Sequence, residues 1–222
     1  MEICGQLEQD KFVLKVLKEK INGYFCEIGS RDAIDINNSY TLEKNYNWKG
    51  IMVEFDTSHI EQYKKIRPNS IHLMQDARQI NYRKVFDDNN FPVNCDYLQI
   101  DLEVENRSTL DVLEIFDKDV FDKYKFATIT FEHDIYNNND IFDTRQKSRD
   151  IFNKRGYIRV FSDVFLFENN EDLALPFEDW YVHPDLVDIN YVNELINKNN
   201  KNYTNKTINN VEKAIKWNNI EY

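Results

Sequence analysis

Acidic residues close successive apolar segments of this chain of 222 residues. Carboxylates can accept hydrogen bonds from a sugar diol, take a proton from a hydroxyl group or hold a divalent cation. If the apolar segments are parallel strands of one sheet, their carboxyl ends meet at one edge, and ligands bind outside that edge. The pattern therefore predicts one polar site built from the segment ends, namely Glu27 with Gly29, Glu54, Asp76, Asp101, and Glu132-His133-Asp134.

Strand-like and helical periodicities alternate along the sequence, which is typical of a layered α/β domain. We expect strands at residues 24–28, 50–53, 71–74, 97–100, 126–131, 157–161 and 164–167, and helices at 7–21, 38–44, 57–66, 108–116, 143–154 and 185–198. The last two strands flank Ser162-Asp163, so we expect them to form an antiparallel hairpin at the edge of a mostly parallel sheet. Residues 1–198 are predicted to form one domain that opens with a helix within 1–22. Residues 199–222 are expected to form a tail or a packing helix over 207–217.

The first predicted strand leads into Gly29, where a missing side chain lets a ligand approach the backbone. Glu54 closes the next strand and can accept two hydrogen bonds from a ribose diol. A nicotinamide dinucleotide site would need Gly-x-Gly-x-x-Gly, whereas this turn has the sequence Gly-Ser-Arg-Asp-Ala. A nicotinamide-dependent enzyme is therefore the weaker interpretation.

The segment GYFCEIGSRDAIDINNSYTLEKNYNWKGIMVEFD resembles the opening of the FkbM-like S-adenosylmethionine-dependent methyltransferases. The later stretch DYLQIDLEVENRSTLDVL is similar to a second block of that family, and the resemblance spans roughly residues 22–167. It implies a Rossmann-like class I methyltransferase fold, with a seven-stranded sheet and helices on both faces. The matching positions of the first block are Glu27, Ile28, Gly29, Asp32, Asn38, Ser39, Leu42, Glu43, Trp48, Gly50, Ile51 and Glu54.

The resemblance also implies that S-adenosyl-L-methionine is the cofactor. Glu27 and Gly29 would face its methionine part, Glu54 its ribose, Asp76 its adenine and Asp101 its sulfonium. The full set of implied cofactor-binding residues is Glu27, Gly29, Ser30, Arg31, Asp32, Asn38, Glu54, Phe55, Asp76, Ala77 and Asp101. Two simpler roles stay open, because Asp76 could only cap a turn and Glu54 could pair with Lys49.

Two positions depart from the family pattern. Phe55 stands where the family usually has Pro, and Ala33 replaces a glycine that usually closes the first loop. If φ is positive at Ala33, the side chain costs about 1 kcal/mol and the loop reshapes. Such a loop would favour the alternative of a methyltransferase-like binding or scaffold domain without turnover.

Methyl transfer to a hydroxyl needs a base and in some enzymes a metal ion. We expect His133 and Asp101 to take the acceptor proton, with Glu132 beside them. Asp101, Glu103 and His133 could together hold a divalent cation such as Mg or Mn. The simpler role for His133 is a loop residue hydrogen-bonded to Asp134.

The segment PFEDWYVHPDLVD is predicted to be a lid or an edge segment. Trp180 and Tyr181, beside acids and His183, could form a wall that stacks on a sugar ring. The alternative is a packed strand with Trp180 in the core. We expect the acceptor to be a small molecule, such as a sugar or glycan.

The net charge of −11 disfavours general binding to nucleic-acid phosphates. Asp101-Leu102-Glu103-Val104 also differs from the Asn/Asp-Pro-Pro-Tyr/Phe motif of enzymes that methylate nucleic-acid amino groups. No segment is apolar enough to span a bilayer, and from the opening residues we expect no signal peptide. With three scattered cysteines, the sequence predicts a cytoplasmic protein, and it leaves the oligomeric state open.

Overall fold

The computed structural model describes residues 4–137, 141–168 and 173–200. The predicted tail or packing helix over 207–217 lies outside the described residues. Within these ranges, no helix has the length and apolarity needed to cross a bilayer.

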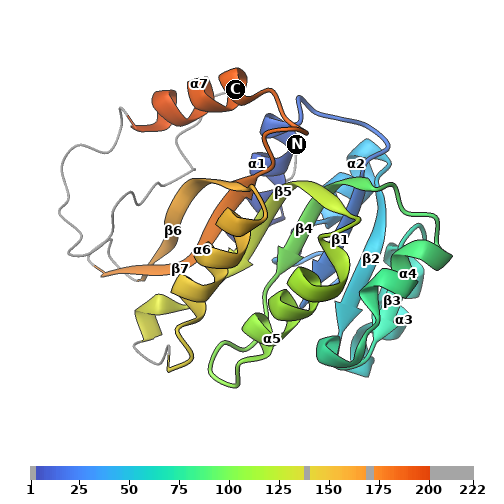
Figure 1. The fold of residues 1–222 in the computed structure, drawn as a ribbon. Helices are drawn as coiled ribbons and strands as arrows, with labels where there is room; N and C mark the ends of the chain where they lie inside the picture. Colours follow the sequence, from blue (N-terminus) through green and yellow to red (C-terminus); the bar gives the residue numbers. More distant parts are fainter. Residues whose placement is uncertain (1–3, 138–140, 169–172, 201–222) are drawn as a thin grey trace.

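The core of the molecule is a seven-stranded sheet with the order β3-β2-β1-β4-β5-β7-β6 (Figure 1). The first five strands run parallel, and β7 pairs antiparallel with both β5 and β6. This confirms the predicted fold class. The strands are β1 (Tyr24–Ile28), β2 (Lys49–Glu54), β3 (Ile71–Met74), β4 (Asn94–Ile100), β5 (Lys125–Glu132), β6 (Ile158–Glu168) and β7 (Leu173–Val182).

Helices cover both faces of the sheet because the central strands are apolar on both faces. One face packs against α1 (Gln9–Val16), α2 (Tyr40–Tyr46), α3 (Ile60–Ile66) and α7 (Ile189–Asn200). The other packs against α4 (Tyr82–Asp88), α5 (Ser108–Ile115) and α6 (Thr144–Lys154). Figure 1 shows α5 and α6 on the near side of the sheet and α1 behind it. We call these the α1 face and the α6 face.

The predicted hairpin between residues 157–161 and 164–167 is wrong, because these two segments do not pair with each other. The two runs assigned to it form one long strand, β6, whose pairing with β7 shifts register around Asp163. A bulge of this kind lets a strand continue past polar residues that resemble a turn in the sequence. The true hairpin partner is β7, the segment that was predicted to be a lid or an edge.

The first helix is shorter than predicted. It ends at Val16, and Lys18 and Glu19 then adopt positive φ angles of 53° and 55°. The prediction extended the helix because Leu17 and Ile21 have helical spacing in the sequence. Spacing of apolar residues does not show where the backbone turns to the left-handed conformation, so it does not locate the end of the helix.

Candidate functional site

A pocket of about 280 Å³ opens at the carboxyl ends of β1 to β4. From β1 the chain runs outward through β2 to β3 and then returns to β4 on the other side of β1, so the strand order reverses beside the pocket. In open α/β sheets, ligands bind at this reversal. The lining includes Gly29, Glu54, Phe55, Asp76, Ala77, Arg78, Leu102 and Glu103.

Gly29 allows the ends of β1 and β4 to approach each other. Its φ is +87°, and a Cβ atom built on it would lie 1.8 Å from the carbonyl oxygen of Asp101. The amide of Asp101 in turn donates to the carbonyl of Ile28 at 3.0 Å. Only glycine combines this backbone conformation with so close a neighbour, so Gly29 shapes one wall of the pocket.

Glu54 joins two loops of the pocket through its carboxylate. One oxygen accepts the amides of Phe55 and Asp56 at 2.7 and 2.8 Å, and the other accepts the amide of Arg31 at 2.8 Å. In the described part of the chain, Glu54 forms no ion pair with Lys49. The Phe55 side chain lines the same pocket and is 75% exposed, which leaves a flat ring open to a ligand.

Asp76 lines the pocket and also caps the turn that follows β3. Its carboxylate accepts the backbone amide of Arg78 at 2.9 Å and two guanidinium nitrogens of the same residue at 3.0 and 2.8 Å. The bonds from Arg78 hold the pKa of this carboxyl below its usual value. The turn-capping role that the sequence left open is therefore present in the structure.

Glu27 lies behind the pocket and does not line it. The side chain is 1% exposed and accepts the amide of Asn38 at 2.9 Å, the hydroxyl of Ser39 at 2.6 Å and the amide group of Asn37 at 3.1 Å. Burial raises the pKa of Glu27 above its usual value. Glu27 and Asn38 thus fix the segment between β1 and α2, while the pocket lining itself does not include Glu27.

The loop after β1 is held by side chains beneath it. Ser30 is buried against the Tyr63 hydroxyl at 2.9 Å, while Arg31 is exposed. Asp32 accepts the amides of the next turn and the amide group of Gln62 at 2.9 Å. Ala33 is fully buried and does not have a positive φ. The departure from glycine therefore causes no backbone strain, and the observation that favoured a scaffold without turnover is removed.

Four acidic side chains gather beside the pocket on the α1 face. Side chains alternate across a strand, so residues two apart share a face. Glu132 shares the α1 face with Thr130 of β5, as Glu178 does with Trp180 of β7. Gln9 of α1 donates to Glu178 at 2.8 Å. The members of this acidic cluster are Asp101, Glu132, Asp134 and Glu178.

Burial and mutual repulsion change the protonation of the acidic cluster. Burial and the neighbouring charge of Asp101 raise the pKa of Glu132 well above its usual value, and Glu132 hydrogen-bonds to Asp101. Burial raises the pKa of Asp134 to about 6, although a hydrogen bond from Glu132 acts in the opposite direction. The protonated form of Glu132 is therefore favoured, whereas the pKa of about 6 leaves Asp134 mostly ionised at neutral pH.

His133 points to the α6 face, away from Glu132 and Asp134. The ring is fully buried, and its Nε2 atom lies 3.5 Å from a carboxylate oxygen of both Asp163 and Asp179. Its Nδ1 atom accepts the amide of Ile135 at 3.3 Å. The structure thus does not bring His133 together with Asp101 and Glu132, because strand alternation separates it from the residues beside it in sequence.

The structure does not bring the three predicted metal ligands together either. Asp101, Glu103 and His133 do not converge, since the described residues contain one group of three candidate ligands within 4.8 Å of one another, His133, Asp163 and Asp179. The two aspartates of that group already bind the guanidinium groups of Arg145 and Arg149. A divalent cation there would meet two positive charges, so these donors do not fit it.

The aromatic wall predicted for a sugar is part of the core. Trp180 is fully buried, with its ring 4.7 Å from that of Phe12 and 5.5 Å from that of Phe161. Tyr181 is 2% exposed on the other face of β7, and His183 is buried as well. The alternative that placed Trp180 in the core is confirmed. Glu178 was missed as a site residue because its strand was assigned to a lid, although the alternation in PFEDWYV carries a strand signal.

Comparison with known proteins places the fold among methyltransferases. No family model and no curated protein matches the sequence. Among solved structures, precorrin-6y C5,15-methyltransferase from Geobacter metallireducens GS-15 is similar at 14% identity and a TM-score of 0.50, covering 82% of this chain and 90% of that one. A SAM-dependent methyltransferase from Archaeoglobus fulgidus has 15% identity and a TM-score of 0.47, with coverage of 80% and 94%. The sheet order and the likeness to the Geobacter structure show that the chain has the Rossmann-like methyltransferase fold.

Proposed function

We propose that the protein is an S-adenosylmethionine-dependent methyltransferase that transfers a methyl group to a hydroxyl group of a small molecule. The observation that carries the proposal is the pocket at the strand-order reversal, which brings Gly29, Glu54 and Asp76 together. The sugar or glycan class of acceptor rests on the resemblance to the FkbM-like family.

The lining residues fit an adenosine group. Glu54 keeps acceptor capacity beyond its three backbone amides, because a carboxylate offers about four lone-pair sites. We assign its remaining capacity to the ribose hydroxyls. The exposed ring of Phe55 offers a stacking surface for adenine. Gly29 lines the same pocket, and its missing side chain allows the ends of β1 and β4 to approach each other there.

The acidic cluster offers two things that methyl transfer to a hydroxyl needs: negative charge near the sulfonium and a base for the hydroxyl proton. The cofactor provides an electrophilic methyl group on a cationic sulfonium, and nearby carboxylates attract that charge. Asp101 follows β4, next to Leu102 and Glu103 of the pocket lining. Asp134 is poised to take the hydroxyl proton, since its pKa of about 6 leaves it ionised at neutral pH.

Glu54→Gln is expected to weaken binding of S-adenosylhomocysteine by about 1–3 kcal/mol, the range for losing a hydrogen bond to a charged group. The change keeps the side-chain size but removes the charge and one acceptor oxygen. Calorimetric titration of the full chain measures the affinity. Glu61→Gln is a matched control, because Glu61 is an exposed carboxylate of α3 outside the pocket.

Unchanged affinity in Glu54→Gln would contradict the ribose assignment. Failure of the unaltered protein to bind at millimolar ligand would refute the proposed function itself. Thermal unfolding of the variant separates lost binding from lost folding, because Glu54 also holds the loops after β1 and β2.

Methyl transfer is expected to rise with pH through about 6, as Asp134 loses its proton. A base must be ionised to accept a proton, so turnover falls below this pH and levels off above it. Asp134→Asn should lower turnover about a hundredfold and remove the inflection, while cofactor affinity stays close to that of the unaltered protein. Initial rates between pH 5 and pH 8 test this, measured with an acceptor found by screening small molecules. If the inflection near pH 6 is still present in Asp134→Asn, another residue is the base.

A further inference from the structure

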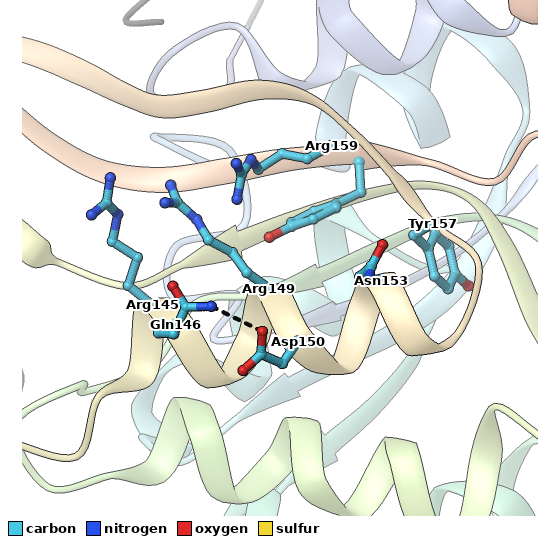
Figure 2. A pocket seen from close by; sticks show the side chains of 8 residues that line it. Arg145, Gln146, Arg149, Asp150, Asn153, Tyr157 and Arg159 are labelled. Atoms are coloured by element: carbon cyan, nitrogen blue, oxygen red, sulfur yellow. Dashed lines mark hydrogen bonds between the residues drawn. The ribbon is translucent and has the colours of Figure 1, made fainter. Parts of the chain in front are cut away.

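A second pocket, of about 500 Å³, lies on the α6 face between α6 and the strands β6 and β7 (Figure 2). It shares no lining residue with the pocket at the ends of β1 to β4. Arg145, Arg149 and Asn153 of α6, Arg159 of β6 and two tyrosines contribute to its lining. The proposed methyl-donor site does not account for it.

Three arginines face this pocket in a chain of net charge −11. Arg145 and Arg149 are four residues apart on α6, so they project from the same side of the helix. Arg159 reaches the same space from the neighbouring strand. Figure 2 shows the three guanidinium groups in a row along one side of the pocket.

Buried aspartates neutralise two of the three arginines. Asp163 and Asp179 are fully buried, and they bind Arg145 and Arg149 through charge-assisted hydrogen bonds. All three of these bonds of the Arg149 guanidinium group use its Nε and Nη2 atoms, so its Nη1 atom is not bonded to either aspartate. These bonds also fix the direction in which the guanidinium plane points.

Arg159 is the third and least compensated charge. Its side chain is 27% exposed, and its contact with Asp179 is 3.9 Å long. In the ranges that the structure describes, it makes no hydrogen bond. A half-buried guanidinium with five N–H donors and no hydrogen-bond partner is suited to an anion. Asp150 is the acidic residue of the pocket lining, and its carboxylate accepts a hydrogen bond from the side-chain amide of Gln146 at 2.9 Å rather than from Arg159.

We propose that this pocket binds a phosphate dianion, either as free phosphate or as the terminal group of a small phosphate ester. Guanidinium groups bind phosphate through paired N–H bonds, and a tetrahedral dianion can contact more than one arginine at once. The pocket is large enough for the organic part of an ester, and Asn153, Tyr157 and Tyr181 provide polar and aromatic surface for it.

Calorimetric titration of the full chain with inorganic phosphate, glucose 6-phosphate and acetate tests this proposal. We expect both phosphate compounds to bind more tightly than acetate. Tighter binding of glucose 6-phosphate than of inorganic phosphate would identify an ester as the source, and equal binding would identify free phosphate. No binding of either at millimolar concentration, or equal binding of acetate, would overturn the proposal.

Arg159→Gln should weaken phosphate binding about tenfold or more, because it removes the uncompensated charge. Lys154→Gln is the matched control, since it removes one positive charge from the end of α6 but lies outside the pocket lining. Its phosphate affinity should stay within about twofold of the unaltered protein. Equal affinities of Arg159→Gln and the unaltered protein would contradict the site, and thermal unfolding of both variants checks that they are folded.

Discussion

Gly29→Ala is expected to abolish detectable binding of S-adenosylhomocysteine and to destabilise the protein by at least about 3 kcal/mol. The added Cβ atom would lie 1.8 Å from the carbonyl oxygen of Asp101, and that oxygen belongs to the backbone at the end of β4. Neither strand end can move alone, because the Asp101 amide donates to the Ile28 carbonyl at 3.0 Å and the Gly29 amide donates to the Val53 carbonyl at 2.9 Å. The overlap must therefore distort the pocket wall. Calorimetry and denaturant unfolding measure the two effects.

Gly156→Ala provides the matched control for Gly29→Ala. Gly156 also has a positive φ, of +82°, but its nearest neighbour to an added Cβ atom is the His183 ring at 4.0 Å. The control should cost only about 1 kcal/mol for the left-handed conformation. If the two variants lose the same stability and Gly29→Ala still binds the ligand, then close approach of β1 and β4 does not shape the pocket.

Much of the fold could be predicted from the sequence because the central strands are apolar on both faces. The strand predicted at residues 24–28 coincides with β1, and the one at 71–74 coincides with β3. The prediction failed at the last two strands, where Ser162-Asp163 resembled a turn. Asp163 is fully buried and bound by Arg145 and Arg149, and these contacts come from a helix that precedes it in sequence. A polar residue satisfied by distant partners cannot be recognised from its neighbours alone.

The candidate site was predicted in part. Gly29, Glu54, Phe55, Asp76 and Ala77 line one pocket, because the ends of neighbouring parallel strands meet at one edge. Glu132-His133-Asp134 was treated as one cluster, but strand alternation sends His133 to the opposite face. The same alternation divides Glu178 from Asp179 on β7. At this edge of the sheet, Glu132 and Glu178 on the α1 face have raised pKa values, whereas the aspartates on the α6 face are paired with arginines.

Asp179→Asn is expected to lower the free energy of unfolding by about 3–5 kcal/mol, the range for removing one partner of a buried ion pair. Asp179 is fully buried and accepts Arg149 through two bonds at 2.7 and 2.9 Å. Burial acts to raise its pKa, but the neighbouring His133 ring and the hydrogen bonds from Arg149 outweigh burial and hold the pKa well below its usual value of 3.8. A carboxyl with a depressed pKa in the folded state stabilises the protein above its unfolded-state pKa, and that stabilisation is lost as the pH falls below it.

The difference in stability between the unaltered protein and Asp179→Asn should therefore be full at pH 7 and shrink as the pH falls below about 4. Denaturant unfolding at several pH values measures it. Asp188→Asn is the control, because Asp188 forms an exposed pair with Lys18 and should cost less than about 1 kcal/mol. Equal losses in the two variants would show that the ion pairs on the α6 face do not hold β5, β6 and β7 together. A large loss confined to Asp179→Asn, with its pH dependence, would show that this buried network fixes the strand ends from which Glu132 and Glu178 reach the acidic cluster.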